Sequence, residues 1–182
     1  MFDIHVLEKR KIRFDDVFAP GSIDFFDECL KQVGDLRAAG VAELVDPFGS
    51  RGIHIQGEVQ GEMEVPCARC LAPTRFSVSC PLDLFYRPMA QIAREEEVAV
   101  TEAEVEIAFY QGAGLELADV VREQVLMQLP MRSVCREDCK GICPACGKNR
   151  NRESCGCREA FSDPRWEALR NWKDQEPPIN AD

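Results

Sequence analysis

Histidine is scarce in this chain, with two in 182 residues. Neither His5 nor His54 lies near a cysteine pair, so we interpret both as structural or surface groups. The sequence also lacks a phosphate-binding Gly-Lys-Ser/Thr loop, a Gly-x-Ser-x-Gly turn and a His-Glu-x-x-His motif. These absences predict that the protein is not an enzyme and takes no small-molecule substrate.

Long apolar runs are absent as well. No stretch approaches the roughly 18 consecutive apolar residues of a transmembrane helix, so we expect no membrane contact. The segment Met1–Arg10 has an acid at position 3 and no apolar run of signal-peptide length. We therefore expect a cytoplasmic protein, in which thiols stay reduced and close cysteine pairs favour metal or redox chemistry over disulfides.

Positive charge is in deficit, with 22 Lys and Arg against 32 Asp and Glu and a formal net charge of −10. This balance excludes a protein that coats nucleic acid without specificity. Residues 131–158, however, carry seven cations against three acids. The candidate RNA contacts in this basic segment are Arg132, Arg136, Lys140, Lys148, Arg150 and Arg152. Alternatively, these cations only offset the charge of neighbouring thiolates.

Cysteine is abundant, and eight of the ten cysteines form four close pairs. The pairs are Cys67 with Cys70, Cys135 with Cys139, Cys143 with Cys146, and Cys155 with Cys157. Two such pairs supply the four ligands of a tetrahedral zinc site, so four pairs predict two zinc ions. Four sulfur ligands leave no position for a reactive water, which predicts a structural role for both ions. Cys29 and Cys80 lie in apolar stretches, where a free cysteine behaves as a small hydrophobic residue.

The segment Cys143-Pro-Ala-Cys146-Gly147 is the most specific metal signal. Its proline presets a tight turn, its glycine tolerates positive φ, and backbone amides in such a turn point at the first sulfur. We expect Cys155 and Cys157 to complete this site, and Cys67 and Cys70 to share an ion with Cys135 and Cys139. A competing partition puts Cys135 or Cys139 in the later site and leaves Cys67 and Cys70 as free thiols.

The apolar pattern predicts an α+β fold, with an antiparallel sheet body, few helices and a zinc-stapled C-terminal extension. Alternation predicts strands over 2–6, 43–45, 53–65 and 76–84, and shorter ones around Val98, Val100 and 105–109. The strands over 53–65 and 76–84 should form a hairpin with Cys67-Ala-Arg-Cys70 at its tip. Helical spacing predicts helices over 23–33 and 117–129, the second ending at Pro130.

Pro130 is the domain boundary that the sequence predicts. Residues 1–130 would form the α+β body with the Cys-x-x-Cys hairpin, interrupted by an acidic linker over 87–97. Residues 131–176 would form the cysteine-rich zinc extension and a terminal helix that begins at Asp163-Pro164, an N-cap followed by a first-turn proline. Residues 177–182 would form a disordered tail.

Several of these motifs together are similar to the YceD family, the large ribosomal RNA subunit accumulation proteins. They are Cys67-x-Arg-Cys70, Leu129-Pro130, Cys135-x-x-x-Cys139-Lys-Gly-Ile-Cys143-Pro-x-Cys146-Gly, Cys155-x-Cys157 and Asp163-Pro164-Arg165. The resemblance runs from about residue 20 to residue 173. It implies a non-enzymatic bacterial or plastid factor needed for large-subunit (23S) ribosomal RNA to accumulate.

Our leading interpretation is therefore a ribosome-biogenesis factor whose basic segment binds large-subunit ribosomal RNA or an assembly intermediate. The acidic body would then face protein, and a basic ribosomal protein is an alternative partner. Two other classes remain open. One is a redox-sensing zinc protein whose thiolates oxidise and release metal. The other is a zinc-ribbon module that binds DNA or protein, although a DNA reader needs a basic helix that the sequence does not supply.

Overall fold

The structure is a computed structural model that describes residues 1–46, 51–89 and 107–157. Contacts divide the chain into two compact units. The first unit comprises Met1–Ala68 and Ala72–Cys135, and the second comprises Arg69–Leu71 and Arg136–Asp182. The hairpin tip, residues 69–71, is thus grouped with the C-terminal part of the chain.

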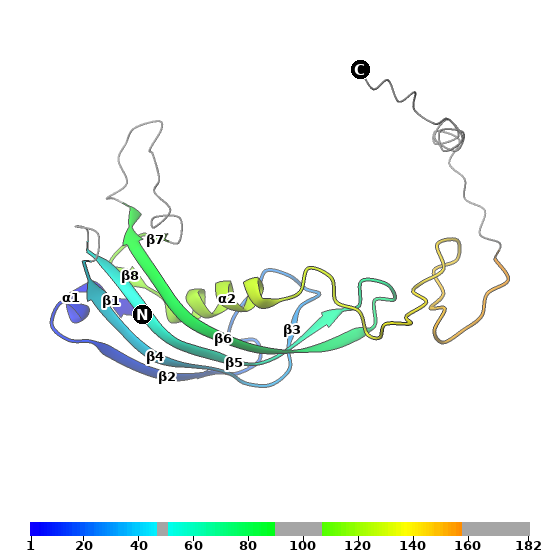
Figure 1. Ribbon diagram of the computed structural model, residues 1–182, viewed down its shortest axis with the longest axis horizontal. Helices are drawn as coiled ribbons and strands as arrows, with labels where there is room; N and C mark the ends of the chain where they lie inside the picture. Colours follow the sequence, from blue (N-terminus) through cyan, green and yellow to red (C-terminus); the bar gives the residue numbers. More distant parts are fainter. Residues whose placement is uncertain (47–50, 90–106, 158–182) are drawn as a thin grey trace, which may run out of the picture. The chain divides into compact units, whose positions relative to one another are not determined.

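A six-stranded sheet dominates the first unit (Figure 1). Its strands are β2 (Ile12–Phe18), β3 (Lys31–Gln32), β4 (Leu36–Val45), β5 (Gly52–Pro66), β6 (Pro73–Pro88) and β7 (Ile107–Tyr110). The order is β2-β4-β5-β6-β7, with β3 paired to β5 off this path. All pairings are antiparallel except β6 with β7, which is parallel. A separate small sheet pairs β1 (Phe2–Asp3) with β8 (Gly114–Leu115).

The long hairpin of β5 and β6 is the feature that the sequence predicts best. Its antiparallel register runs without a break from Ile53 opposite Tyr86 to Pro66 opposite Pro73. Every second residue of β5 points into the core, which buries Ile53, Ile55, Val59, Met63 and Val65. The predicted hairpin, with Cys67 to Cys70 at its tip, is confirmed.

Helix α2 (Leu117–Gln128) covers part of the sheet by packing against β5 and β6. Its buried residues recur at helical spacing: Leu117, Val120, Val121, Gln124 and Val125. The helix stops because Leu129 is already extended and Pro130 follows it. Cys80 of β6 lies buried under this helix, where its sulfur accepts a hydrogen bond from Gln128 Nε2 at 3.5 Å.

Two predictions for the N-terminal part of the chain are wrong. Residues 23–33 do not form a helix, because the side chains of Asp24 and Asp27 accept hydrogen bonds from the backbone amides of Phe26 and Cys29. Such local turns compete with helix formation, and Phe26 has a φ of 55°, outside the right-handed helical region. Residues 2–6 do not form one strand either, since Asp3 caps the short helix α1 (Ile4–Leu7) through His5 N.

The predicted fold class is correct in its coarser part: the described residues form a sheet-rich structure with an open sheet and two helices. The sheet is not purely antiparallel, because β7 joins β6 in parallel. The predicted terminal helix at Asp163, the tail, most of the acidic linker and the strands at Val98 and Val100 lie outside the described residues. In the part of the chain that is described, no helix is long and apolar enough to span a membrane.

Candidate metal centres

The eight paired cysteines lie in two groups of four. The first group is Cys67, Cys70, Cys135 and Cys139, and the second group is Cys143, Cys146, Cys155 and Cys157. Within each group all sulfur atoms lie within 4.8 Å of one another. Sulfurs around one tetrahedral zinc are about 3.8 Å apart, so either group could close on an ion with small side-chain shifts. The grouping is the partition that the sequence favours over its competitor.

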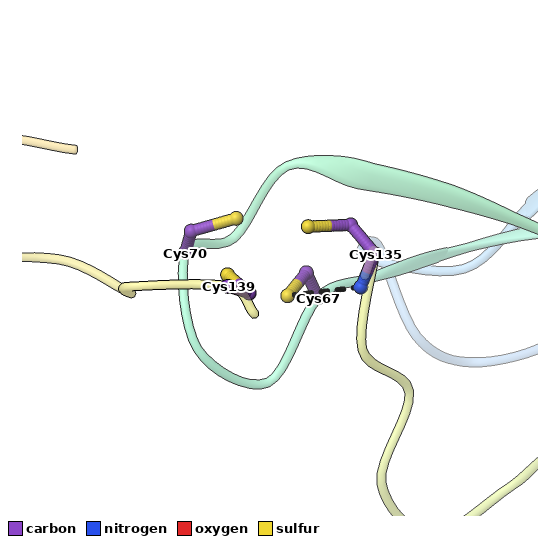
Figure 2. A group of neighbouring side chains, drawn as sticks. All are labelled: Cys67, Cys70, Cys135 and Cys139. Carbon is purple, nitrogen blue, oxygen red and sulfur yellow. Dashed lines mark hydrogen bonds between the residues drawn. The ribbon is translucent and has the colours of Figure 1, made fainter. Parts of the chain in front are cut away.

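Turn geometry at the hairpin tip brings Cys67 and Cys70 together (Figure 2). The amide of Cys67 donates to Ala72 O at 2.8 Å, which closes the tip, and Leu71 reverses the chain with a φ of 60°. The amide of Ala68 donates to Ser133 O at 2.8 Å, and the amide of Cys135 donates to Cys67 Sγ at 3.4 Å. A backbone N–H aimed at sulfur stabilises the thiolate form, which is the form that binds metal.

Arg69 fixes the backbone around the last ligand of the first group. Its Nη1 donates to Glu137 O at 2.9 Å and to Cys139 O at 3.0 Å, while Arg69 O accepts from Ile142 N at 3.0 Å. Gly141 permits this close approach, because it has a φ of 72° and a Cβ there would lie 2.9 Å from Arg69 O. The arginine of the Cys-x-Arg-Cys motif therefore binds the backbone carbonyls of the segment that carries Cys139.

Asn151 supports the first group from outside the cysteine pairs. Its Nδ2 donates to Cys139 Sγ at 3.3 Å. Its Oδ1 accepts from Lys140 N at 2.8 Å and from Arg136 Nη2 at 2.9 Å. One side chain thus contacts the ligand sulfur and the backbone next to it, and such supporting contacts orient metal ligands.

The second group is built around the turn that begins at Cys143. The amide of Gly147 donates to Cys143 O at 2.8 Å, the amide of Cys143 donates to Lys148 O at 2.8 Å, and Gly147 has a φ of 73°. A single β-bridge between Ile142 and Asn149 flanks the turn. Gly147, after the second cysteine, thus has the positive φ that the sequence predicts.

The thiols of the second group differ in acidity. Hydrogen bonds from the backbone amides of Cys146 and Ala145 lower the pKa of Cys143 to about 6. The pKa of Cys157 is raised to about 12, chiefly because its thiol hydrogen-bonds with Cys146, and the pKa of Cys155 is raised by its hydrogen bond with Cys143. Cys143 therefore deprotonates before Cys155 and Cys157, and a bound cation would take the place of the protons on those two thiols.

Burial also separates the two groups. In the first group Cys67, Cys70 and Cys139 are buried, and only Cys135 is exposed. In the second group Cys146 and Cys157 are exposed, Cys155 is half-buried, and only Cys143 is buried. Oxidants and chelators would consequently reach the sulfurs of the second group more readily.

The donor set of each group fits a tetrahedral site with four sulfur ligands. Each group offers four thiol sulfurs, and zinc takes four thiolates in structural sites. No nitrogen or carboxylate ligand is needed to complete either shell. The described residues thus contain two groups that could each hold a metal ion.

The six candidate RNA contacts lie at the surface, with Arg150 half-buried and the others exposed. Some of them are engaged within the protein. Arg136 contacts Asp138 at 3.3 Å as well as Asn151, and Lys148 contacts Glu153 at 3.4 Å. In the described residues Arg132, Lys140 and Arg152 form no ion pair. The seventh cation of the basic segment, Arg158, lies outside the described residues.

Asn151 and Ser133 are the supporting residues that sequence reasoning missed. Asparagine and serine are common in loops, so neither residue stands out in a single sequence. Ser133 contributes only its backbone carbonyl, which every residue type has, so its contact cannot be predicted from the sequence. Only the proximity of Asn151 to two cysteine pairs in a segment rich in Lys and Arg could have drawn attention to it.

Fold and site together define a sheet-rich protein with two four-cysteine groups that could hold metal. Residues 55–173 match the family described as large ribosomal RNA subunit accumulation protein YceD. The chain belongs to the YceD family, as its motifs predict.

Relatives of the chain occur in several bacteria and in a plant. An uncharacterized protein of Mycobacterium tuberculosis is 35% identical over 136 residues, which is 74% of this chain and 58% of the relative. The chain therefore spans less than two thirds of the length of that mycobacterial protein. The uncharacterized protein YlbN of Bacillus subtilis is 23% identical over 93% of this chain and 92% of its own length. No solved structure matches the chain.

One relative has a name that refers to ribosomal RNA. It is the chloroplastic large ribosomal RNA subunit accumulation protein YCED homolog 1 of Arabidopsis thaliana. It is 28% identical to this chain over 61 residues, which is 34% of this chain and 19% of the relative.

Proposed function

We propose that the protein is a non-enzymatic factor that supports accumulation of large-subunit ribosomal RNA. Family membership is the observation that carries this proposal, since the family description and the name of the Arabidopsis relative both refer to that RNA. The four-sulfur donor sets support the non-enzymatic part, because a closed shell holds no reactive water.

Each cysteine group holds one structural zinc ion in this proposal. Thiolate sulfur is a preferred ligand of zinc, and the oxygen ligands that calcium and magnesium require take no part in either group. The ion replaces the protons of the four thiols and fixes the loops that carry them. Because residues 133–157 have little regular structure, metal binding supplies much of their folding free energy.

The basic segment, residues 131–158, makes the RNA contact in our proposal. Five of its six candidate cations are exposed, and they lie in the segment that carries six of the eight paired cysteines. Phosphate contacts by such residues give binding that is sensitive to salt and directed by RNA shape. The alternative, in which the cations only offset two clusters of thiolate charge, predicts no RNA binding by this segment.

Two experiments test this proposal. Crosslinking in living cells, followed by sequencing of the bound nucleic acid, should recover large-subunit ribosomal RNA or its precursors. Cells that lack the protein should accumulate less of that RNA relative to small-subunit RNA. Normal RNA levels together with no recovered ribosomal RNA would overturn the proposal.

The RNA contact itself is tested by replacing Lys148, Arg150 and Arg152 together with Ser. None of these residues is a candidate metal ligand, so zinc content should not change. Binding to large-subunit ribosomal RNA should weaken, and the negative slope of log K against log salt should become shallower by about two to three units. Unchanged affinity and salt slope would show that RNA does not contact these three residues of the basic segment.

A redox-sensing role is the second candidate, and the exposure of the second group favours it. Cys146 and Cys157 are accessible to oxidants, and Cys143 has a pKa of about 6, so metal-free Cys143 is largely thiolate at neutral pH. Mild peroxide should then release zinc from the second group before the first, as shown by a zinc indicator and a count of free thiols. Simultaneous or absent release would exclude this role.

A further inference from the structure

A hollow of about 570 Å³ lies on the sheet of the first unit, where β2, β4 and β5 run side by side. Arg10, Lys11 and Arg13 line it together with Val41, Glu43 and Gln56. Register explains the gathering, because Arg13 pairs with Val41 and Val41 pairs with Gln56 across three adjacent strands. Residues directly opposite in a sheet point to the same face, and this is the face opposite the core residues Phe14, Ala42 and Ile55.

The hollow has an excess of positive charge. Three cations face one acid, and Glu43 already pairs with Lys11 through its Oε2. Arg10 and Arg13 are exposed and have no carboxylate partner in the described part of the chain. Their charge is available to a ligand.

Arg37 and Arg75 of the same sheet behave differently from Arg10 and Arg13. Arg37 forms two hydrogen bonds with Asp15 at 2.7 Å, and Arg75 lies 3.7 Å from Glu62. Acids outnumber cations in this chain, so a cation has many possible carboxylate partners. Arg10 and Arg13 of the hollow therefore differ from Arg37 and Arg75, whose charges are already balanced by carboxylates.

We propose that this hollow binds the phosphodiester backbone of RNA, as a second contact apart from the basic segment. The inference rests on the proposed function, which names RNA as the ligand but assigns it only to residues 131–158. Arg10 and Arg13 contact phosphate oxygens, to which the planar guanidinium offers paired N–H donors. The volume lies within the usual range of sites for small ligands, so the hollow accommodates a nucleotide-sized portion of a chain.

The acceptors in the hollow favour RNA over an acidic peptide. Glu43 retains acceptor capacity beyond its pair with Lys11, and the Gln56 amide, which also hydrogen-bonds Asp83, keeps its oxygen as an acceptor and a second N–H as a donor. A ribose-phosphate unit matches this arrangement, because it brings phosphate oxygens to the cations and a 2′-hydroxyl donor to the acceptors. The side chains of an acidic peptide bring acceptors alone.

The hollow and the cysteine end of the hairpin lie far apart along β5. Gln56 precedes Pro66 by ten residues, which is about 33 Å of extended strand. The hollow and the basic segment share no residue. The two contacts are therefore separable by mutation.

The test uses the full-length double variant Arg10→Gln, Arg13→Gln and a transcript of large-subunit ribosomal RNA. The control is Arg37→Gln, Arg75→Gln, which removes the same charge from arginines that already have carboxylate partners. The first variant should bind roughly 10- to 30-fold more weakly at 0.1 M salt. The negative slope of log K against log salt should become shallower by about 1.4 units, at about 0.7 per lost phosphate contact. The control variant should keep a slope close to that of the wild type.

The outcomes separate this inference from the proposed function. The Arg10→Gln, Arg13→Gln variant could show wild-type affinity and salt slope while the triple Ser variant of the basic segment binds more weakly. That result would overturn RNA binding by the hollow and leave the proposed function in place. No binding of this RNA by the wild-type protein would overturn both. Polyglutamate and inorganic phosphate serve as competitors, and displacement of the RNA by either at matched charge concentration would overturn the assignment to RNA backbone. All variants should keep the wild-type circular dichroism spectrum, since the four arginines are exposed.

Discussion

Asn151 donates a hydrogen bond from Nδ2 to Cys139 Sγ at 3.3 Å, although it belongs to neither cysteine group. The same side chain accepts from Lys140 N and Arg136 Nη2, so it links the ligand to the backbone on its C-terminal side. A neutral donor next to a thiolate stabilises the charge without competing for the metal. Asn151 is therefore a positioning residue of the first group.

Replacing Asn151 with Ala should weaken zinc binding at the first group by about 10- to 100-fold, because supporting contacts orient the ligand sulfur. Competition with a chelator of known affinity measures this change. Ser154→Ala is the control, since Ser154 is exposed and forms no hydrogen bond with the first group in the described structure. Equal zinc affinity in the two variants would contradict a role for Asn151 in positioning the ligands of the first group.

Protein purified without added metal should contain close to two zinc ions per chain by elemental analysis. Cys143→Ser should contain one, because the remaining three thiols of the second group no longer close the shell. The sheet of the first unit should keep its circular dichroism signal, since none of its strands contributes a ligand to that group. Fewer than two ions in the wild-type protein would contradict the two-site arrangement.

Cys70→Ser should loosen two segments that are distant in sequence. The first group combines the hairpin tip with Cys135 and Cys139, and metal-binding free energy is largely folding free energy at such a site. Hydrogen exchange should therefore accelerate at Ala68 and at Cys139, whose amides donate to Ser133 O and Arg136 O. Cys29→Ser, outside both groups, should change neither amide. Faster exchange at the hairpin tip alone would contradict a shared ion.

Alkylation of the metal-free protein should follow the acidity of the thiols. The pKa of Cys143 is about 6, below its ordinary value of 9.0, so Cys143 is mostly thiolate at pH 7 and loses reactivity as the pH falls through 6. The pKa of Cys157 is about 12, so this thiol should stay protonated until strongly alkaline pH. Mass spectrometry after brief iodoacetamide treatment between pH 5 and 9 gives the order of modification. Equal rates at the two residues would contradict the amide contacts to Cys143.

The sequence predicts elements whose pattern is repeated over a long stretch. Alternation over β5 and β6 was sufficient because the core side of each strand is uniformly apolar, and α2 was predicted because Pro130 marks its end. The prediction of a helix over 23–33 is wrong because it considers only the spacing of apolar residues. It takes no account of Asp24 and Asp27, whose side chains form local turns. Edge strand β2 was missed because its Ile-Arg-Phe-Asp-Asp-Val-Phe sequence mixes charge with a short apolar pattern.

The candidate sites divide in the same way. Cysteine pairs are visible in a sequence because two close ligands must share one ion, and the structure brings the pairs together as their number predicts. The contacts of Asn151 and Arg69 depend on loops that meet only after folding. The hollow could not be predicted, because Arg10 and Arg13 meet Gln56 only through the pairing of β2 with β4 and of β4 with β5.

The two cysteine groups are completed at different moments of synthesis. Cys139 follows Cys67 by 72 residues, which at about 5–20 residues per second takes roughly 4–14 s. During this interval Cys67 and Cys70 precede the synthesis of the other two cysteines of their group, and two thiols alone cannot close a four-ligand shell. The second group spans only residues 143–157 and assembles within about 3 s of its first ligand. The first group is therefore the later of the two to be completed relative to its first cysteine. It is also the better buried group in the folded chain.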